Sequence, residues 1–114
     1  MVVLLSCDLA VLSRVEGAAA RLNQGVRSAS NESQAVEFCD AKDTNTLIID
    51  LSMPFLDLAG LVSQVKTNES SGARIVAFGP HVHEQRLAAA REAGCDLDVS
   101  RGQLFSQLET ILKG

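Results

Sequence analysis

Short apolar runs alternate along the chain with longer stretches in which apolar residues recur every three or four positions. A short, mostly apolar run between polar segments is typical of a strand that is buried on both faces. The clearest run is Thr46–Ile49, whereas the second is recognised mainly by its place between two helical stretches. The expected strands are Val2–Leu5, Gly25–Ala29, Thr46–Ile49, Arg74–Phe78 and Asp96–Ser100.

Helices are expected between these strands, because capping and stop residues stand beside the helical stretches. Asp8 can cap the first helix, and Gly25 is free to take the left-handed conformation that ends it. Ser30 or Asn31 can cap the second helix, and Gly94 can stop the fourth. The expected helices cover residues 9–23, 31–41, 56–66 and 83–93, and a last helix carries Leu104, Leu108, Ile111 and Leu112 on one stripe.

The regular alternation of strands and helices predicts a mainly parallel sheet with right-handed crossovers. Five strand–helix pairs with short connections favour a flavodoxin-like, three-layer α/β sandwich of strand order 2-1-3-4-5. A dinucleotide-binding fold would need G-x-G-x-x-G after the first strand, but that turn reads Ser6-Cys7-Asp8-Leu9-Ala10. With 114 residues and no linker or internal repeat, the chain 1–114 is expected to form one domain.

Composition and charge narrow the class of protein. A formal net charge of -4 without a basic patch argues against a binder of nucleic acid or anionic membranes. No run approaches the roughly 18 apolar residues that a membrane span needs, and the first apolar run lacks the basic flank of a signal peptide. The three cysteines form neither a C-x-x-C pair nor a zinc-type cluster, which indicates thiols in a reducing cytoplasm.

Candidate chemistry lies where the strands end, because ligands of open parallel sheets bind beyond the carboxyl ends of the strands. These positions offer one carboxylate near the centre, one cation, small hydroxyls and a cysteine. The residues are Ser6, Cys7 and Asp8 after the first strand, Asp50 to Met53 after the third, Phe78 to His81 after the fourth, and Ser100 to Gly102 after the fifth.

The segment Leu47-Ile48-Ile49-Asp50-Leu51-Ser52-Met53-Pro54 resembles the phosphoacceptor segment of response-regulator receiver domains, in which an aspartate ends the third strand and Met-Pro follows after two residues. The fourth strand, the Ala93-Gly94-Cys95-Asp96 turn and the closing amphipathic helix are similar to that family in order and spacing. The resemblance covers essentially the whole chain and places Asp50 at the phosphoacceptor position.

The resemblance also implies a metal site, and the matching positions depart from it. The family holds Mg²⁺ with two adjacent acidic residues after the first strand, where this chain has Ser6 and Cys7. Asp8 falls one place late and is more simply a helix cap. Since Mg²⁺ prefers hard oxygen ligands, a hydroxyl and a thiol are poor substitutes, and Asp8 and Asp50 are weak metal candidates. We therefore expect no resident cofactor, with Mg²⁺ as the doubtful exception.

The switch residues that the resemblance implies are missing as well. Gly79 stands where a Thr or Ser should capture the phosphoryl group, and Asp98 where an aromatic ring should rotate. Arg101 replaces the lysine after the fifth strand, Gly102 the proline that follows it, and Leu58 a loop glycine. Arg101 is expected to pair with Asp50, because a permanently charged guanidinium can fill the space of a metal.

Three functions remain open. The first is a stand-alone pseudo-receiver in the cytoplasm that signals through protein contacts, not as an enzyme. The second is a phosphoacceptor in a two-component phosphorelay, with Asp50 phosphorylated by a histidine kinase or a small phosphodonor. The third is a flavodoxin-like binder of a small molecule, with a pocket around Cys7, Asp50 and Gly79.

Other chemistry-bearing residues have plainer interpretations. Cys7 could be a reactive thiol but is expected to be structural, and His81 and His83 are expected to be surface residues and not a metal pair. The exposed face of the fourth helix (83–93), the fifth strand and the last helix can form a homodimer or dock a protein, with Asp98 and Phe105 as candidate interface residues. The fourth helix is expected to have a solvated face, on which pairing between side chains of the helix is possible, formed by Glu84, Arg86, Arg91 and Glu92.

Overall fold

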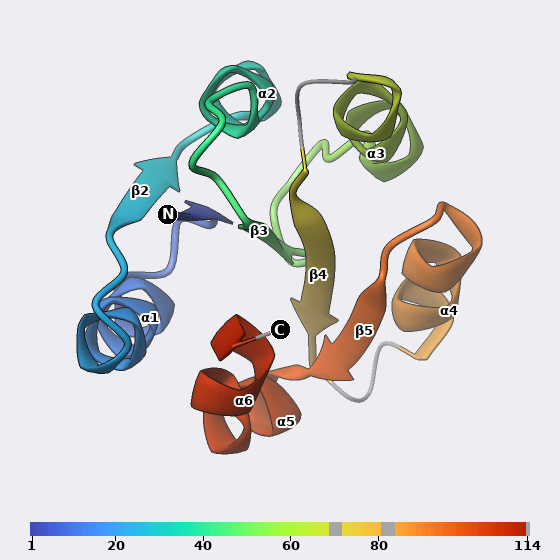
Figure 1. Cartoon of the computed structure of the whole chain (residues 1–114). Coiled ribbons are helices and arrows are strands. Elements are labelled where there is room, and N and C mark those ends of the chain that lie inside the picture. Colours follow the sequence, from blue (N-terminus) through green and yellow to red (C-terminus); the bar gives the residue numbers. More distant parts are fainter. Residues whose placement is uncertain (69–71, 81–83, 114) are drawn as a thin grey trace.

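The computed structural model describes residues 1–68, 72–80 and 84–113 and contains one parallel sheet of order β2-β1-β3-β4-β5 (Figure 1). This order confirms the predicted flavodoxin-like topology. The strands are β1 (Val2–Leu5), β2 (Val26–Ala29), β3 (Thr46–Asp50), β4 (Arg74–Gly79) and β5 (Leu97–Ser100). Each neighbouring pair runs parallel, and β1 and β3 pair from Val2 with Thr46 to Leu5 with Ile49.

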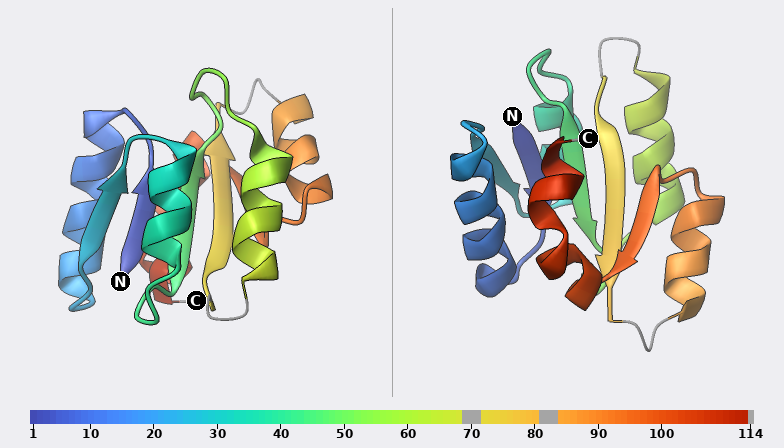
Figure 2. Two further views of the ribbon diagram at one scale, coloured as in Figure 1. Left: turned by 90° about the horizontal axis from the view of Figure 1, so that it is seen from above. Right: turned by 60° about the horizontal axis from the view of Figure 1, so that its bottom comes forward.

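Helices cover both faces of the sheet, as parallel sheets require. α1, α5 and α6 lie on one face, and α2, α3 and α4 lie on the other (Figures 1 and 2). No helix in the part of the chain that the structure describes is long and apolar enough to cross a membrane. The helices are α1 (Leu9–Arg21), α2 (Glu32–Cys39), α3 (Leu58–Thr67), α4 (Glu84–Glu92), α5 (Arg101–Ser106) and α6 (Leu108–Lys113).

The strands divide the core into two aliphatic layers, because successive side chains point to opposite faces. On β1, Val3 and Leu5 pack with the layer under α2, α3 and α4, while Val2 and Leu4 pack with the layer under α1, α5 and α6. All four of these side chains are fully buried. The continuous apolar runs in the sequence are thus strands that are buried on both faces.

The end of the first helix differs from expectation. α1 stops at Arg21, two residues before the expected end, and the left-handed residue after it is Asn23 (φ 57°), not Gly25. Asparagine tolerates this conformation better than most residues. Gly25 has another role, since a Cβ there would lie 3.1 Å from the terminal methyl carbon of Met1.

The closing helix also differs from expectation, because it is two short helices and not one. α5 begins at Arg101, after a capping box in which Ser100 and Gln103 satisfy each other's backbone N–H groups. Gln107 (φ -119°) leaves the helical conformation and separates α5 from α6. The expected stripe of Leu104, Leu108 and Ile111 is nevertheless buried, so the break preserves the apolar face.

A partly exposed contact of Asp96 fixes the start of β4. It lies at the amino ends of the strands, at the opposite end of the sheet from the candidate site. The Asp96 carboxylate accepts hydrogen bonds from the Ile75 N–H (2.8 Å) and from Lys66 Nζ on α3 (2.8 Å). Burial of Asp96 opposes its ionisation, but these bonds and the nearby positive charges outweigh that effect and lower its pKa. The contact therefore stabilises the fold in its ionised form.

We expect Asp96→Asn to reduce the dependence of stability on pH. Because the folded pKa is lowered, this contact contributes fully above the unfolded pKa near 4 and is lost as the pH falls. At neutral pH the loss should be about 1 kcal/mol or less, since the pair is partly exposed and screened. Urea unfolding from neutral to acidic pH measures it. Lys66→Gln, which removes only the ammonium partner, should reduce the pH dependence less than Asp96→Asn does. The same pH dependence in the natural chain and both variants would contradict the stabilising role of ionised Asp96.

Candidate functional site

Asp50 ends β3 and is buried, with 6% of its surface exposed. Its carboxylate accepts two hydrogen bonds, one at each oxygen. The Ser6 hydroxyl donates to Oδ2 at 2.7 Å, and the backbone N–H of Ser52 donates to Oδ1 at 2.8 Å. Both donors are neutral, so among the described residues the carboxylate is held by hydrogen bonds and not by a cation.

Ser6 reaches Asp50 because β1 and β3 are neighbours in the sheet and end at the same level. Its side chain is buried, and its oxygen also accepts the backbone N–H of Asp8 at 3.1 Å. The hydroxyl therefore bridges the start of α1 to the carboxylate at the end of β3. The sequence placed Ser6 in the site but gave no signal for this bond, which depends on how the two strand ends are aligned.

Asp8 caps α1, as expected, and its carboxylate also forms an ion pair with Arg101. Its Oδ1 accepts from the N–H groups of Ala10 (2.9 Å) and Val11 (3.4 Å), and its Oδ2 lies 2.6 Å from Arg101 Nη1. The hydrogen bond from Arg101 lowers the pKa of Asp8. The expected pairing of Arg101 with Asp50 is therefore wrong. Asp8 is partly exposed and held by its cap, whereas Asp50 is buried against Ser6.

Arg101 has a second contact, which defines the surroundings of Phe105. The guanidinium carbons of Arg101 and of Arg14 on α1 lie 5.2 and 4.9 Å from the centre of the Phe105 ring. Phe105 is half-buried, and two arginines of its own chain contact it. This arrangement fixes α5 against α1 and leaves less of Phe105 for a partner than the sequence suggested.

Gly79 ends β4 and is buried in the position expected for the phosphoryl-binding hydroxyl. A Cβ built there would lie 3.5 Å from the Cβ of Leu51, which is an ordinary van der Waals distance. A serine would therefore fit. Packing does not force the absence of a hydroxyl at this position.

Asp98 lies on β5 where the family pattern has an aromatic ring, and it is held by α4. Arg91 donates to its two oxygens from Nε (3.1 Å) and Nη2 (2.9 Å), and Asp98 in turn raises the pKa of Arg91. Arg91 is exposed, as expected for a solvated helix face, and its ion pair is with β5 and not within α4. The side chain of Arg86 also reaches beyond α4, and its Nη1 donates to the carbonyl of Leu51 at 3.2 Å.

The residues present do not fit a magnesium ion. The Ser6 hydroxyl is engaged with Asp50, the thiol of Cys7 is a soft ligand, and Asp8 is neutralised by Arg101. Within residues 1–68, 72–80 and 84–113 there is no group of three or more acidic, histidine or cysteine residues that could hold a metal. Cys7 itself is exposed, while Cys39 and Cys95 are buried free thiols. The histidines at 81 and 83 and the serines at 70 and 71 lie outside the described residues.

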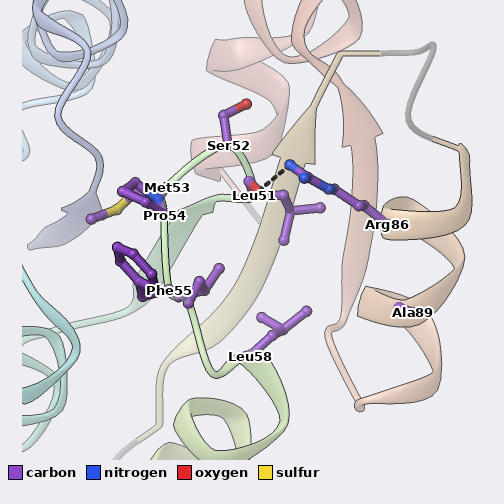
Figure 3. Close-up of a pocket in the computed structure, with 9 residues that line it drawn as sticks. Leu51, Ser52, Met53, Pro54, Phe55, Leu58, Arg86 and Ala89 are labelled. Atoms are coloured by element: carbon purple, nitrogen blue, oxygen red, sulfur yellow. Dashed lines mark hydrogen bonds between the residues drawn. The ribbon is translucent and has the colours of Figure 1, made fainter.

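A groove of about 570 Å³ lies beside the site, between α4 and the β3–α3 loop (residues 51–57) (Figure 3). Its walls come from that loop and from α4, whereas the sequence placed a ligand pocket around Cys7, Asp50 and Gly79. Arg86, which the sequence assigned to a solvated face, reaches into it. The lining residues are Leu51, Ser52, Met53, Pro54, Phe55, Leu56, Leu58, Arg86 and Ala89.

Comparison with curated proteins finds a partial relative. The chain is 31% identical over 84 residues to the nitrate/nitrite response regulator protein NarL of Escherichia coli strain K12. The match covers 74% of this chain but only 36% of NarL, so the chain spans about a third of the length of this relative. No family model matches the chain.

Comparison with solved structures finds receiver domains over nearly the whole chain. The receiver domain of the sensor histidine kinase PA1611 from Pseudomonas aeruginosa, solved with magnesium in its active-site cleft, has a TM-score of 0.79 at 18% identity and covers 98% of this chain and 93% of its own. The NtrX receiver domain from Brucella abortus gives 0.80 at 13% identity, with 99% and 95% covered. A CheY-like protein, TadZ, from P. aeruginosa gives 0.76 at 20% identity, with 98% and 95% covered.

We expect Ser6→Ala to destabilise the chain by about 1–3 kcal/mol, because it removes a donor from a buried carboxylate. Ser52→Ala is the matched control, since its backbone N–H stays on Asp50 while an exposed hydroxyl is lost. Its effect should be within about 0.5 kcal/mol. Urea denaturation of the three chains provides the comparison, and equal stability of the two variants would contradict the role given to Ser6.

Proposed function

We propose that this chain, which has the fold of response-regulator receiver domains, is a signalling domain that acts through protein–protein contacts without Mg²⁺-dependent phosphorylation of Asp50. The observation that carries the proposal is the hydrogen bond between the Ser6 hydroxyl and the buried Asp50 carboxylate. In this account the chain is one receiver-like domain of the cytoplasm with no enzymatic activity of its own. Its partner is a histidine kinase or another signalling protein.

The chemistry of phosphoryl transfer supports this proposal. Transfer to a carboxylate brings negatively charged groups together, and a cation must neutralise the transferring oxygens. The two described donors to Asp50 are a hydroxyl and a backbone N–H, which carry no charge. The nearby guanidinium of Arg101 is committed to Asp8. A phosphoryl group on Asp50 would therefore lack the charge compensation that the reaction needs.

The conformational response supports it as well. In receivers, a hydroxyl at the end of the fourth strand moves toward the phosphoryl group, and an aromatic ring in the fifth strand rotates into the space. Gly79 has no hydroxyl, and Asp98 is bound through both carboxylate oxygens to Arg91. Neither residue can make that movement, so this face would present one constant surface to a partner.

The competing function is a phosphoacceptor response regulator. It is favoured by the position of Asp50 itself, which ends β3 at the edge of the sheet where a receiver is phosphorylated. A solved relative in fold, the NtrC4 receiver domain dimer, was studied in a beryllofluoride-activated form. The same phosphoryl mimic can therefore decide between the two functions.

The deciding experiment follows the amide NMR spectrum while Mg²⁺ and beryllofluoride are added. We expect no shifts centred on Asp50 and no propagation to Gly79 or β5. Asp50→Asn is the control, because any nonspecific effect of the reagents persists in it. Saturable shifts around Asp50 that vanish in Asp50→Asn would overturn the proposal in favour of the phosphoacceptor.

A second prediction restores the acidic pair. We expect the double variant Ser6→Asp/Cys7→Asp to be stabilised by Mg²⁺, by about 1.4 kcal/mol at ten times its Kd, because binding to the folded state alone raises stability. The natural chain should show no Mg²⁺-dependent change in Tm. Ser6→Asn/Cys7→Asn, of similar shape but uncharged, should also show none. Equal stabilisation of the natural chain would contradict the account of its site.

A further inference from the structure

Phe55 in the β3–α3 loop combines two unusual features. Its backbone is in the left-handed region (φ 59°), and its side chain is fully exposed, at 100% relative accessibility. A bulky residue rarely adopts this conformation, and strain of this kind concentrates at binding and switch sites. Exposure of the ring and strain in the loop both cost folding free energy in an isolated domain. A binding partner that covers the ring would recover part of that cost.

The loop that carries Phe55 is fixed at both ends. The Met53 N–H donates to the Asp50 carbonyl at 3.3 Å, and the Asp57 N–H donates to Glu32 Oε1 on α2 at 2.7 Å. Asp57 also caps α3 through the Gly60 N–H. The ring is therefore displayed by a tethered loop, which lowers the entropy that a contact with it would cost.

The other phenylalanines of the chain are all covered. The sequence has four, and Phe78 lies in the core. Phe38 has the guanidinium of Arg27 at 4.7 Å from its ring centre, and Phe105 has those of Arg14 and Arg101. Among the described residues no arginine covers Phe55. The two half-buried rings, Phe38 and Phe105, thus each have a guanidinium group over them, whereas the fully exposed ring of Phe55 has none among the described residues.

An arginine lines the same groove as Phe55. Arg86 is exposed on α4, and in Figure 3 the Phe55 ring lies on the side of the β3–α3 loop away from it, so Arg86 does not cover the ring of its own chain. One of its N–H groups reaches the Leu51 carbonyl, and within the described part of the chain it forms no ion pair with an acidic residue. That bond orients the exposed guanidinium, whose other N–H groups are donors for a further contact.

We infer that this face joins two copies of the chain about a two-fold axis, with Phe55 of each copy against Arg86 of the other. A second copy is the favoured occupant because, among the described residues, this face carries a ring that no guanidinium covers and a guanidinium that forms no ion pair. Since both residues border one groove, the two reciprocal contacts can form around a single axis, as in an isologous dimer. Met53, Leu56 and Leu58 add apolar surface beside them.

This interface shares α4 with the face that the sequence suggested, but it adds the β3–α3 loop and leaves out Asp98 and Phe105. Those two residues are already bound to Arg91, Arg14 and Arg101 of their own chain. The inference goes beyond the proposed function and does not depend on whether Asp50 is phosphorylated. If the chain does not form this dimer, the result of the beryllofluoride experiment does not change. If beryllofluoride binds at Asp50, the expectation of a dimer does not change.

Sedimentation velocity over a series of protein concentrations tests the dimer. We expect a monomer–dimer equilibrium in which Phe55→Ala and Arg86→Ala each raise Kd by at least about tenfold, as truncation of aromatic and arginine anchors does. Leu9→Ala is the matched control, because Leu9 is another large exposed apolar residue, at 79% accessibility, and should leave Kd unchanged. Circular dichroism establishes that each variant is folded.

Mixing the two variants provides the sharper test. A homodimer of Phe55→Ala or of Arg86→Ala keeps neither Phe55–Arg86 contact, whereas their heterodimer keeps one. An equimolar mixture should therefore associate more strongly than either variant alone. A natural chain that is monomeric up to near-millimolar concentration would overturn the inference. A dimer that is weakened by Phe105→Ala and not by Phe55→Ala, or a mixture no stronger than its components, would do so as well.

Discussion

The buried carboxylate of Asp50 is the constraint on which the functional edge of this domain depends. A charged group away from water needs partners, and here the described partners are the Ser6 hydroxyl and one backbone N–H. Because Ser6 also accepts the Asp8 N–H, the same hydroxyl fixes the turn into α1. The carboxyl ends of β1 and β3 are therefore joined at Asp50 by hydrogen bonds from uncharged donors.

The charged side chains around Asp50 link the helices and strands that surround it. Asp8 caps α1 and binds Arg101, so the cation of the site ties the start of α5 to the start of α1. Arg101 and Arg14 then cover Phe105 on the same side of the sheet. On the other side, Arg91 fixes Asp98, and Arg86 reaches over Leu51. Each arginine holds neighbouring elements together, which is consistent with a domain that presents one fixed surface.

The sequence predicted the architecture well because that depends on patterns spread over many residues. Alternating runs predicted the sheet order, and Asp8 and Gly94 marked helix ends correctly. The partner of Arg101 could not be predicted, since the choice between Asp8 and Asp50 depends on burial and on side-chain reach. The break at Gln107 has no glycine or proline beside it, and Pro54 indicates a break before Phe55 without showing that Phe55 takes the left-handed conformation.

We propose that the Ser6 hydroxyl, and not a metal ion, holds the Asp50 carboxylate. A crystal structure of the natural chain grown in a high concentration of Mg²⁺ tests this most directly. We expect Ser6 Oγ to remain within hydrogen-bonding distance of Asp50 Oδ2, with no magnesium ion on that carboxylate. A magnesium ion bound to Asp50, with the Ser6 hydroxyl displaced or ligating it, would contradict this role of Ser6.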